Sequence, residues 1–136
     1  MTSLRSITII LYLVGLLFGC AESKKKYEDY NDTDFIEVQG IITKTKRKTD
    51  FKNVIKTSVY FIYNLDKERP DIGYELDTPF MLHNDEPAII LVHKDDEKVS
   101  FFGARGIIKE DVLLSYLEKC ENIGGDYYGT DENLFN

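Results

Sequence analysis

Two histidines and the carboxylates near them are the residues in this chain best suited to bind a metal ion. They are His83 and His93, with Asp85, Asp95 and Asp96 as acids that could complete a metal site. Two scattered histidines are more often ordinary surface or core residues than ligands. We therefore predict no metal site and no cofactor.

Glu75 and Asp77 could act as an acid and a base if the fold gathered them beside His93 in a deep pocket. No CxxC, HExxH, GxSxG or phosphate-binding loop accompanies them. We predict that the protein is not an enzyme and that it has no catalytic residues, and we keep an enzyme as the lesser alternative.

Three weaker patterns each have a plainer interpretation. Tyr60, Tyr63 and Tyr74 could line a sugar- or peptide-binding face, although aromatic residues at period two are typical of a core. The GxxG stretch of residues 103–106 matches a nucleic-acid-binding loop, but it follows a strand and the chain is acidic. The acids of residues 28–34 lack the glycine and the closing glutamate of a calcium loop.

The first twenty residues have the three parts of a secretory signal. Arg5 is basic, Ile7 to Phe18 is an apolar run, and small Gly19 precedes Cys20. The run is shorter than the ~20 residues that a membrane-spanning helix needs. A short membrane helix that is retained, or a buried core helix, remains the alternative.

The four residues Leu17-Phe18-Gly19-Cys20 resemble the lipobox of bacterial lipoproteins. The resemblance implies cleavage before Cys20, diacylglycerol on its thiol and an acyl chain on its new amine. Two or more acyl chains give stable anchoring, because each buried CH₂ contributes about 0.8 kcal/mol. Ala21 in the next position resembles lipoproteins that are released to the outer membrane. We therefore expect a bacterial cell-envelope protein that meets the membrane through lipid on Cys20.

The second cysteine, Cys120, is expected to lie buried on a helix face as a small apolar residue. A Cys20–Cys120 disulfide is the alternative, and it would exclude the lipid anchor.

Composition favours one globular domain with an acidic surface. Of the 136 residues 43% are hydrophobic and 12% aromatic, which is enough for a core. The formal net charge is −7, whereas nucleic-acid binders need a basic face. We predict no nucleic-acid partner.

The chain divides into four predicted parts: a signal peptide (1–19), a lipidated cysteine with a flexible tether (20–34), a β-barrel domain with a C-terminal helix (35–123) and an acidic tail (124–136). In the tether, the three lysines at 24–26 could press against anionic headgroups or simply be solvated. The tail could be disordered or could dock on the barrel.

Period-two and short apolar runs predict five strands, at residues 36–42, 58–65, 72–77, 88–93 and 99–102. Gly40 indicates a bulge or bend in the first strand, and residues 44–50 are expected to be its end and a turn. Residues 112–120 have helical spacing, and Gly124-Gly125 is expected to end that helix.

The fold class is therefore mainly β, a small five-stranded antiparallel barrel or half-barrel of SH3-like or OB-like type. We expect the strands to form a meander, the C-terminal helix to plug an open end, and a signal helix to precede the domain.

Residues 73–96 resemble small β-domains of unknown function in membrane-associated bacterial proteins. The resemblance is in Gly73-Tyr74-Glu75, Pro79-Phe80-Met81, the strand of residues 86–92 and the turn Lys94-Asp95-Asp96. It implies a small barrel and no particular activity.

The expected function is a non-catalytic binding or assembly module with an envelope protein as its partner. The alternative is an immunity-type lipoprotein that captures a toxin.

Overall fold

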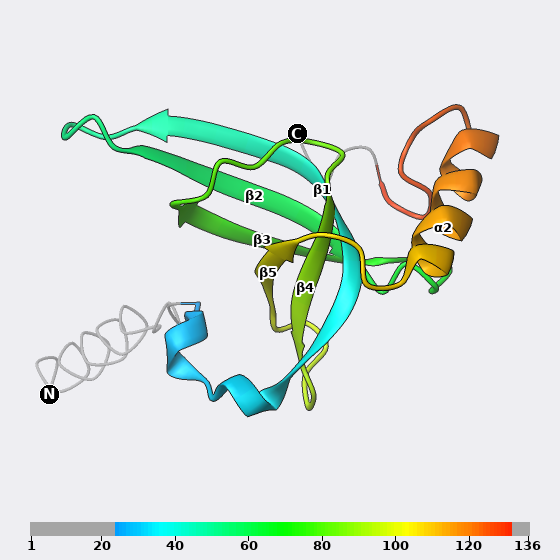
Figure 1. Cartoon of the computed structure of the whole chain (residues 1–136), viewed down its shortest axis with the longest axis horizontal. Helices are drawn as coiled ribbons and strands as arrows, with labels where there is room; N and C mark the ends of the chain where they lie inside the picture. Colours follow the sequence, from blue (N-terminus) through cyan, green and yellow to red (C-terminus); the bar gives the residue numbers. More distant parts are fainter. Residues whose placement is uncertain (1–23, 132–136) are drawn as a thin grey trace, which may run out of the picture.

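The computed structural model describes residues 24–131, so the predicted signal helix and Cys20 lie outside the described residues. Two short 3₁₀ turns, η1 (Tyr27–Asp29) and η2 (Asp32–Asp34), come first. The strands and the helix follow: β1 (Phe35–Thr49), β2 (Ile55–Tyr63), β3 (Asp71–Thr78), β4 (Pro87–His93), β5 (Ser100–Arg105) and α2 (Glu110–Asn122) (Figure 1). The predicted class, mainly β with one C-terminal helix, is confirmed.

The five strands form one antiparallel sheet in the order β3-β2-β1-β4-β5. The run β4-β1-β2-β3 is a Greek key, so the expected meander is wrong. The order arises because β1 has two partners: its first half pairs with β4 and its second half with β2. The sheet curls without closing, as a half-barrel. A partly open, five-stranded Greek-key barrel is the OB architecture, one of the two expected types.

The first strand extends further than the sequence predicts. Residues 44–49, expected to be a strand end and a turn, pair in register with β2 as far as Thr49↔Ile55. The register shift lies between Ile42 and Lys44, beyond Gly40. Gly40 instead marks a close approach, because an added Cβ would lie 2.5 Å from Ile90 Cγ1.

The sheet has a core on each face, because its strands are apolar on both sides. The inner core consists of Ile42, Val59, Phe61, Tyr63, Leu82, Ala88, Ile90 and Val92. On the outer face, Ile41, Ile62 and Leu65 pack against Leu113, Tyr116 and Cys120. Thus α2 packs on the part of the outer face around Ile41 and Ile62, and the prediction that it plugs an open end is wrong. The alternation of strand side chains explains this position, since Ile41 and Ile62 need cover of their own.

The second cysteine and the tail complete the outer core. Cys120 is buried and free, as expected of its place on the helix. Tyr127 and Tyr128 pack against the same cluster, and the Tyr116 hydroxyl donates to the Tyr128 carbonyl at 2.9 Å. As far as residue 131, the tail therefore docks on the domain, which was one of the two expected outcomes.

The N-terminal turns pack where β1 begins and β4 ends. Tyr27 and Tyr30 contact Phe35 and Phe101, with ring centroids 5.2–6.0 Å apart. Residues 27–34, expected to belong to a flexible tether, are therefore held against the domain. The difference arises from their aromatic side chains, which bury apolar area that a polar stalk does not have. The tether before Lys24 stays a prediction.

A buried amide connects the distant parts of the chain. Gln39 is 2% exposed, and its Nε2 lies within 3.1–3.3 Å of the carbonyls of Gly40, Ala88 and Gly106. Its Oε1 accepts from the N–H groups of Ile108 (2.8 Å) and Lys109 (3.3 Å). These two residues directly precede α2, where no side chain at the N-cap makes a capping hydrogen bond. Gln39 therefore holds the segment that leads into the helix.

The helix ends as the sequence predicted. Gly124 and Gly125 have φ of 95° and 97°, which favour glycine, and the Gly125 N–H donates to the Cys120 carbonyl at 2.8 Å.

We expect Gln39→Leu to lower the free energy of unfolding by about 2–4 kcal/mol, because leucine fills similar space but leaves several buried backbone groups without partners. Urea unfolding followed by circular dichroism measures the change. Glu37→Ala, an exposed site on the same strand, is the control and should stay within about 0.5 kcal/mol of the parent. Equal effects in the two variants would contradict the role given to the amide.

Candidate binding surface

The predicted lipidation site, Cys20, lies outside the described residues.

The two histidines do not form a pair. The His93 ring packs against Tyr30 and Phe35, with centroids 5.4 Å apart in each case, whereas His83 Nδ1 lies 3.2 Å from Arg47 Nη2. Within residues 24–131 no group of three or more His, Cys, Asp or Glu side chains is placed to hold a metal ion.

Glu75 and Asp77, the acids considered above as catalytic groups, contact other residues. Glu75 Oε2 accepts from the Phe102 N–H at 3.0 Å, and Asp77 forms an ion pair with Lys48 at 2.8 Å. Neither of these contacts involves His93. Burial raises the pKa of the Glu75 carboxyl, although the Phe102 N–H acts in the opposite direction. This carboxylate bridges β3 to β5, the two edge strands of the open sheet.

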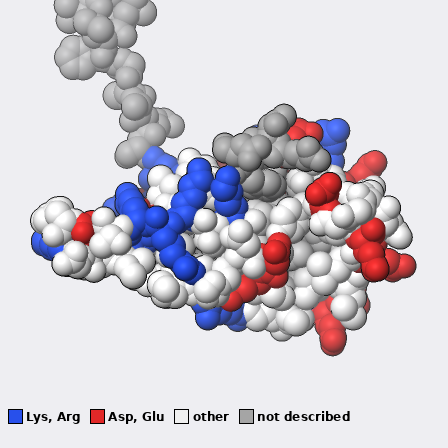
Figure 2. All heavy atoms as spheres, turned by 90° about the horizontal axis from the view of Figure 1, so that it is seen from above, with Lys and Arg blue, Asp and Glu red and all other residues white. Residues whose placement is uncertain are grey.

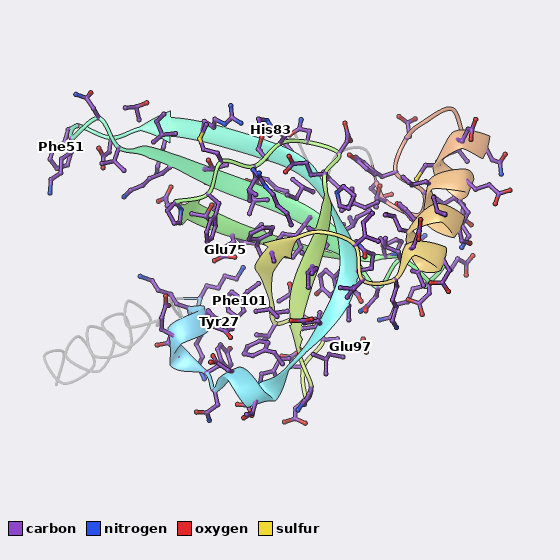
Figure 3. All side chains as sticks on the ribbon, in the orientation of Figure 1. Tyr27, Phe51, Glu75, His83, Glu97 and Phe101 are labelled. Carbon is purple, nitrogen blue, oxygen red and sulfur yellow. The ribbon has the colours of Figure 1, made fainter. Side chains whose placement is uncertain are left out.

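A groove of about 360 Å³ runs beside this bridge, between the N-terminal turns and β3. The Lys24 ammonium donates to the Tyr74 carbonyl at 2.7 Å and lies 3.8 Å from the centroid of the Tyr74 ring. Loss of water lowers the pKa of Lys24, while the nearby Glu75 raises it. Tyr27 and Phe101 also line the groove, and Figure 3 shows them with Glu75 on its two sides. Lys24 is thus part of the domain surface and not of a free stalk.

Two of the three tyrosines considered as a binding face come together. Tyr60 and Tyr74 stack across β2 and β3, with centroids 6.1 Å apart and planes at 28°. Tyr63 is buried in the inner core, and its hydroxyl donates to the Glu97 carbonyl at 2.6 Å.

Exposed apolar side chains continue from this stack along β3 and the following linker. We call Tyr74, Leu76, Phe80 and Met81 the apolar edge; each is at least 43% exposed. A second groove, of about 540 Å³, lies between the linker and β5 and is lined by Phe80, Met81, Phe102 and Arg105 among others. Exposed apolar residues beside a groove are typical of an interaction site.

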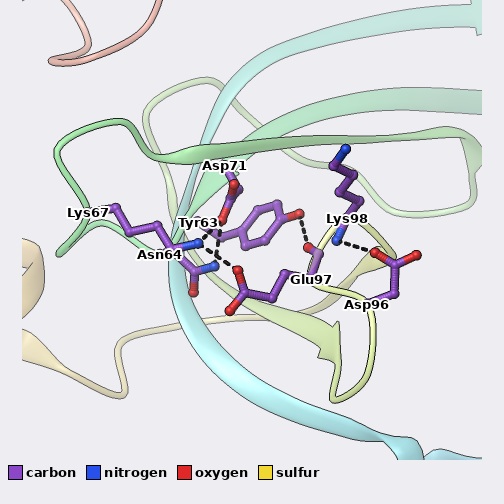
Figure 4. A network of polar contacts seen from close by, with 7 residues as sticks. All are labelled: Tyr63, Asn64, Lys67, Asp71, Asp96, Glu97 and Lys98. Atoms are coloured by element: carbon purple, nitrogen blue, oxygen red, sulfur yellow. Dashed lines mark hydrogen bonds and ion pairs between the residues drawn. The ribbon is translucent and has the colours of Figure 1, made fainter.

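A polar network ties together two loops elsewhere on the sheet (Figure 4). Lys67 Nζ lies 2.8 Å from Asp71 Oδ2 and 2.7 Å from Glu97 Oε2, and Asn64 Nδ2 donates to Asp71 at 2.7 Å. The hydrogen bonds that the Lys67 ammonium donates, first to Asp71 and then to Glu97, raise the pKa of Lys67. The network joins the β2–β3 loop to the β4–β5 turn, which is a structural role.

On the face that Figure 2 shows, most basic side chains lie toward the end formed by β1 and β2, and most acidic ones lie toward the opposite end. Between Lys44 and Lys56 the chain has six basic residues and a single acid, Asp50. Sequence reasoning missed this surface because it assigned the stretch to a turn; the run of basic residues was the available signal.

No family model, curated protein or solved structure matches this chain. No helix within residues 24–131 has the length and apolar character needed to cross a bilayer.

We expect the free energy of unfolding to fall as the pH rises from the ordinary glutamate pKa through the raised pKa of Glu75. A carboxyl whose pKa is higher in the folded state binds its proton more tightly there, so deprotonation costs stability. Glu75→Gln keeps an acceptor for the Phe102 N–H and should flatten the dependence. Urea unfolding between about pH 4 and about pH 7 tests this. Glu37→Gln, at an exposed position of β1, is the control. If the free energy of unfolding of Glu75→Gln depended on pH as steeply as that of the parent, Glu75 could not be the source of the dependence.

Proposed function

We propose that the protein is a lipid-anchored component of the bacterial cell envelope whose β-domain is a non-catalytic binding module. The observation that carries the binding role is the apolar edge, with a groove on its linker side. The anchor is supported by Leu17-Phe18-Gly19-Cys20 after the apolar run.

The surface chemistry favours an envelope protein as the partner. Leu76 is 59% exposed, and Phe80 and Met81 are each half-exposed on the neighbouring linker. Apolar and aromatic side chains of this kind form the buried centres of protein interfaces, while polar groups remain at the rim. Arg105, which pairs with Glu86 at 3.4 Å, lies beside the groove and would belong to such a rim.

Capture of a toxin is the second candidate, and the acidic end of the molecule favours it. The residues Glu110, Asp111, Glu118 and Glu121 are on α2. A basic toxin surface would be attracted to this end and would associate with it faster at low salt. Pull-down partners lost on Glu118→Lys but kept on Phe80→Ser would support this candidate over the first.

The anchor is tested by the mass of the protein purified from its native membrane. We expect the chain to lack residues 1–19 and to contain acyl groups on Cys20. Cys20→Ser should abolish acylation, and Cys120→Ser, which changes the buried cysteine, should retain it. An intact Met1, or a Cys20 thiol that iodoacetamide alkylates, would show that the anchor is wrong.

The binding role is tested by pull-down from envelope extracts with paired variants. Phe80→Ser combined with Leu76→Ser should reduce recovery of a specific partner about tenfold, since truncation of interface anchors typically costs about 1–2 kcal/mol or more. Leu114→Ser removes a similarly exposed leucine from α2 and should leave recovery unchanged. Equal recovery with all three proteins would contradict binding at the apolar edge.

A further inference from the structure

The end of β1 and the start of β2 form an arm that stands away from the sheet. We define the arm as residues 44–56. Its outermost pairs, Lys48↔Lys56 and Thr49↔Ile55, belong to the β1–β2 ladder alone, because β3 pairs with β2 only from Thr57 onward and β4 pairs with β1 only up to Ile41. Figure 1 shows the arm as the most protruding part of the described chain.

The tip of the arm is apolar and fully presented to solvent. Phe51 is 92% exposed, and Val54 and Ile55 behind it are about half-exposed. Figure 3 shows Phe51 at the outer limit of the molecule, pointing away from every other element. Because nothing in its own chain encloses the Phe51 ring, a partner can bury this ring only if the partner's surface is deformable or contains a hollow.

The turn that presents Phe51 is ordered by its own hydrogen bonds. Asp50 Oδ1 accepts from the N–H groups of Lys52 (2.8 Å) and Val54 (3.0 Å), and the Asp50 carbonyl accepts from Asn53 at 3.0 Å. Asn53 has φ of 61°, which asparagine tolerates well. The exposed ring is thus held out by a turn that needs little further ordering on binding.

Lys52 and Lys56 flank this apolar tip, and Lys44, Lys46, Arg47 and Lys48 lie further back along the arm. Two of these contact the domain: Lys48 pairs with Asp77 at 2.8 Å, and Arg47 Nη2 donates to the Leu82 carbonyl at 3.0 Å. The long side chains of lysine and arginine can extend their charges toward headgroups while an adjacent apolar group enters the membrane. The chain as a whole is acidic, at −7, so an anionic surface attracts the arm and repels the opposite end.

We infer that the arm docks on an anionic lipid surface, with Phe51 entering the interfacial region and the flanking basic side chains meeting the headgroups. The inference rests on the proposed function and deepens it, because acyl chains on Cys20 would hold the chain at a membrane and a basic, apolar-tipped arm would set how the domain is turned toward that membrane. Geometry agrees: only three residues separate Cys20 from Lys24, so their Cα atoms can be at most about 14 Å apart. The described chain begins in the half of the molecule that also contains the arm, away from α2 (Figure 1).

A single tryptophan can report on docking, since the chain has none. We would place the full chain carrying Phe51→Trp in phosphatidylcholine vesicles with and without phosphatidylglycerol. In the anionic vesicles the emission should shift to shorter wavelength and be quenched by brominated lipids. High salt should reverse both effects, as the Debye length falls from about 8 Å to about 3 Å at about 1 M. Leu114→Trp on α2, 57% exposed in the parent, is the matched control and should keep the emission of a residue in water.

Charge variants test the electrostatic part. Lys52→Gln with Lys56→Gln should lower the equilibrium constant for insertion of the tryptophan about thirtyfold, since each basic residue near the surface contributes about 1 kcal/mol. Lys119→Gln on α2 should have no effect. Equal insertion into neutral and anionic vesicles, or insertion unaffected by the paired change, would overturn the role of the charges.

The lipid anchor and the docking of the arm can fail separately. The mass of the same samples reports acylation of Cys20, and the fluorescence reports the position of the side chain at the tip. Acylated Phe51→Trp protein whose emission stays that of a residue in water on anionic vesicles overturns docking alone and leaves the arm to a protein partner. Unmodified Cys20 together with an inserted tryptophan at the tip overturns the anchor alone.

Discussion

The side-chain amide of Gln39 connects the sheet to the segment that leads into the helix, and the arrangement of the other elements depends on it. A glutamine amide offers two donors and one acceptor with two lone pairs. Here the donors face carbonyls of β1, β4 and the residue after β5, and the acceptor faces the two N–H groups before α2. In a buried position each of these groups would otherwise lose its hydrogen bond with water. One side chain therefore specifies where β5 ends and where the helix begins.

The same strand determines the shape of the surface. Because β1 pairs with β4 through its first half and with β2 through its second, the sheet bends across it and β3 approaches β5 without a ladder. Glu75 spans this gap with one hydrogen bond. The gap and the free end of β1 produce the two exposed surfaces described above, the apolar edge and the arm. Both result from an open sheet, since a closed barrel has no edge strands.

The sequence predicted what depends on local pattern and missed what depends on distant pairing. The third and fourth predicted strands lie within one residue of β3 and β4 because alternation is local, and Gly124-Gly125 marked the helix end for the same reason. The length of β1 was missed because its second half is too polar to resemble a strand, and only its pairing with β2 reveals it. Polar Gln39 gave no periodic signal at all. At the candidate site, Tyr60 and Tyr74 were among the residues considered as a binding face, whereas no pattern in the sequence distinguished Phe51.

The Greek-key order also has a consequence for the time at which the chain can fold. The first half of β1 begins at Phe35, and its partner β4 ends at His93, so this pairing must wait for almost sixty further residues of the polypeptide. At about 5–20 residues per second of synthesis, that delay is several seconds, and non-local pairing of this kind closes slowly in any case. During this interval the N-terminal strand lacks half of its hydrogen bonds. The proposed function requires the chain to be exported, and such a delay would keep it unfolded and therefore able to pass through a translocation channel.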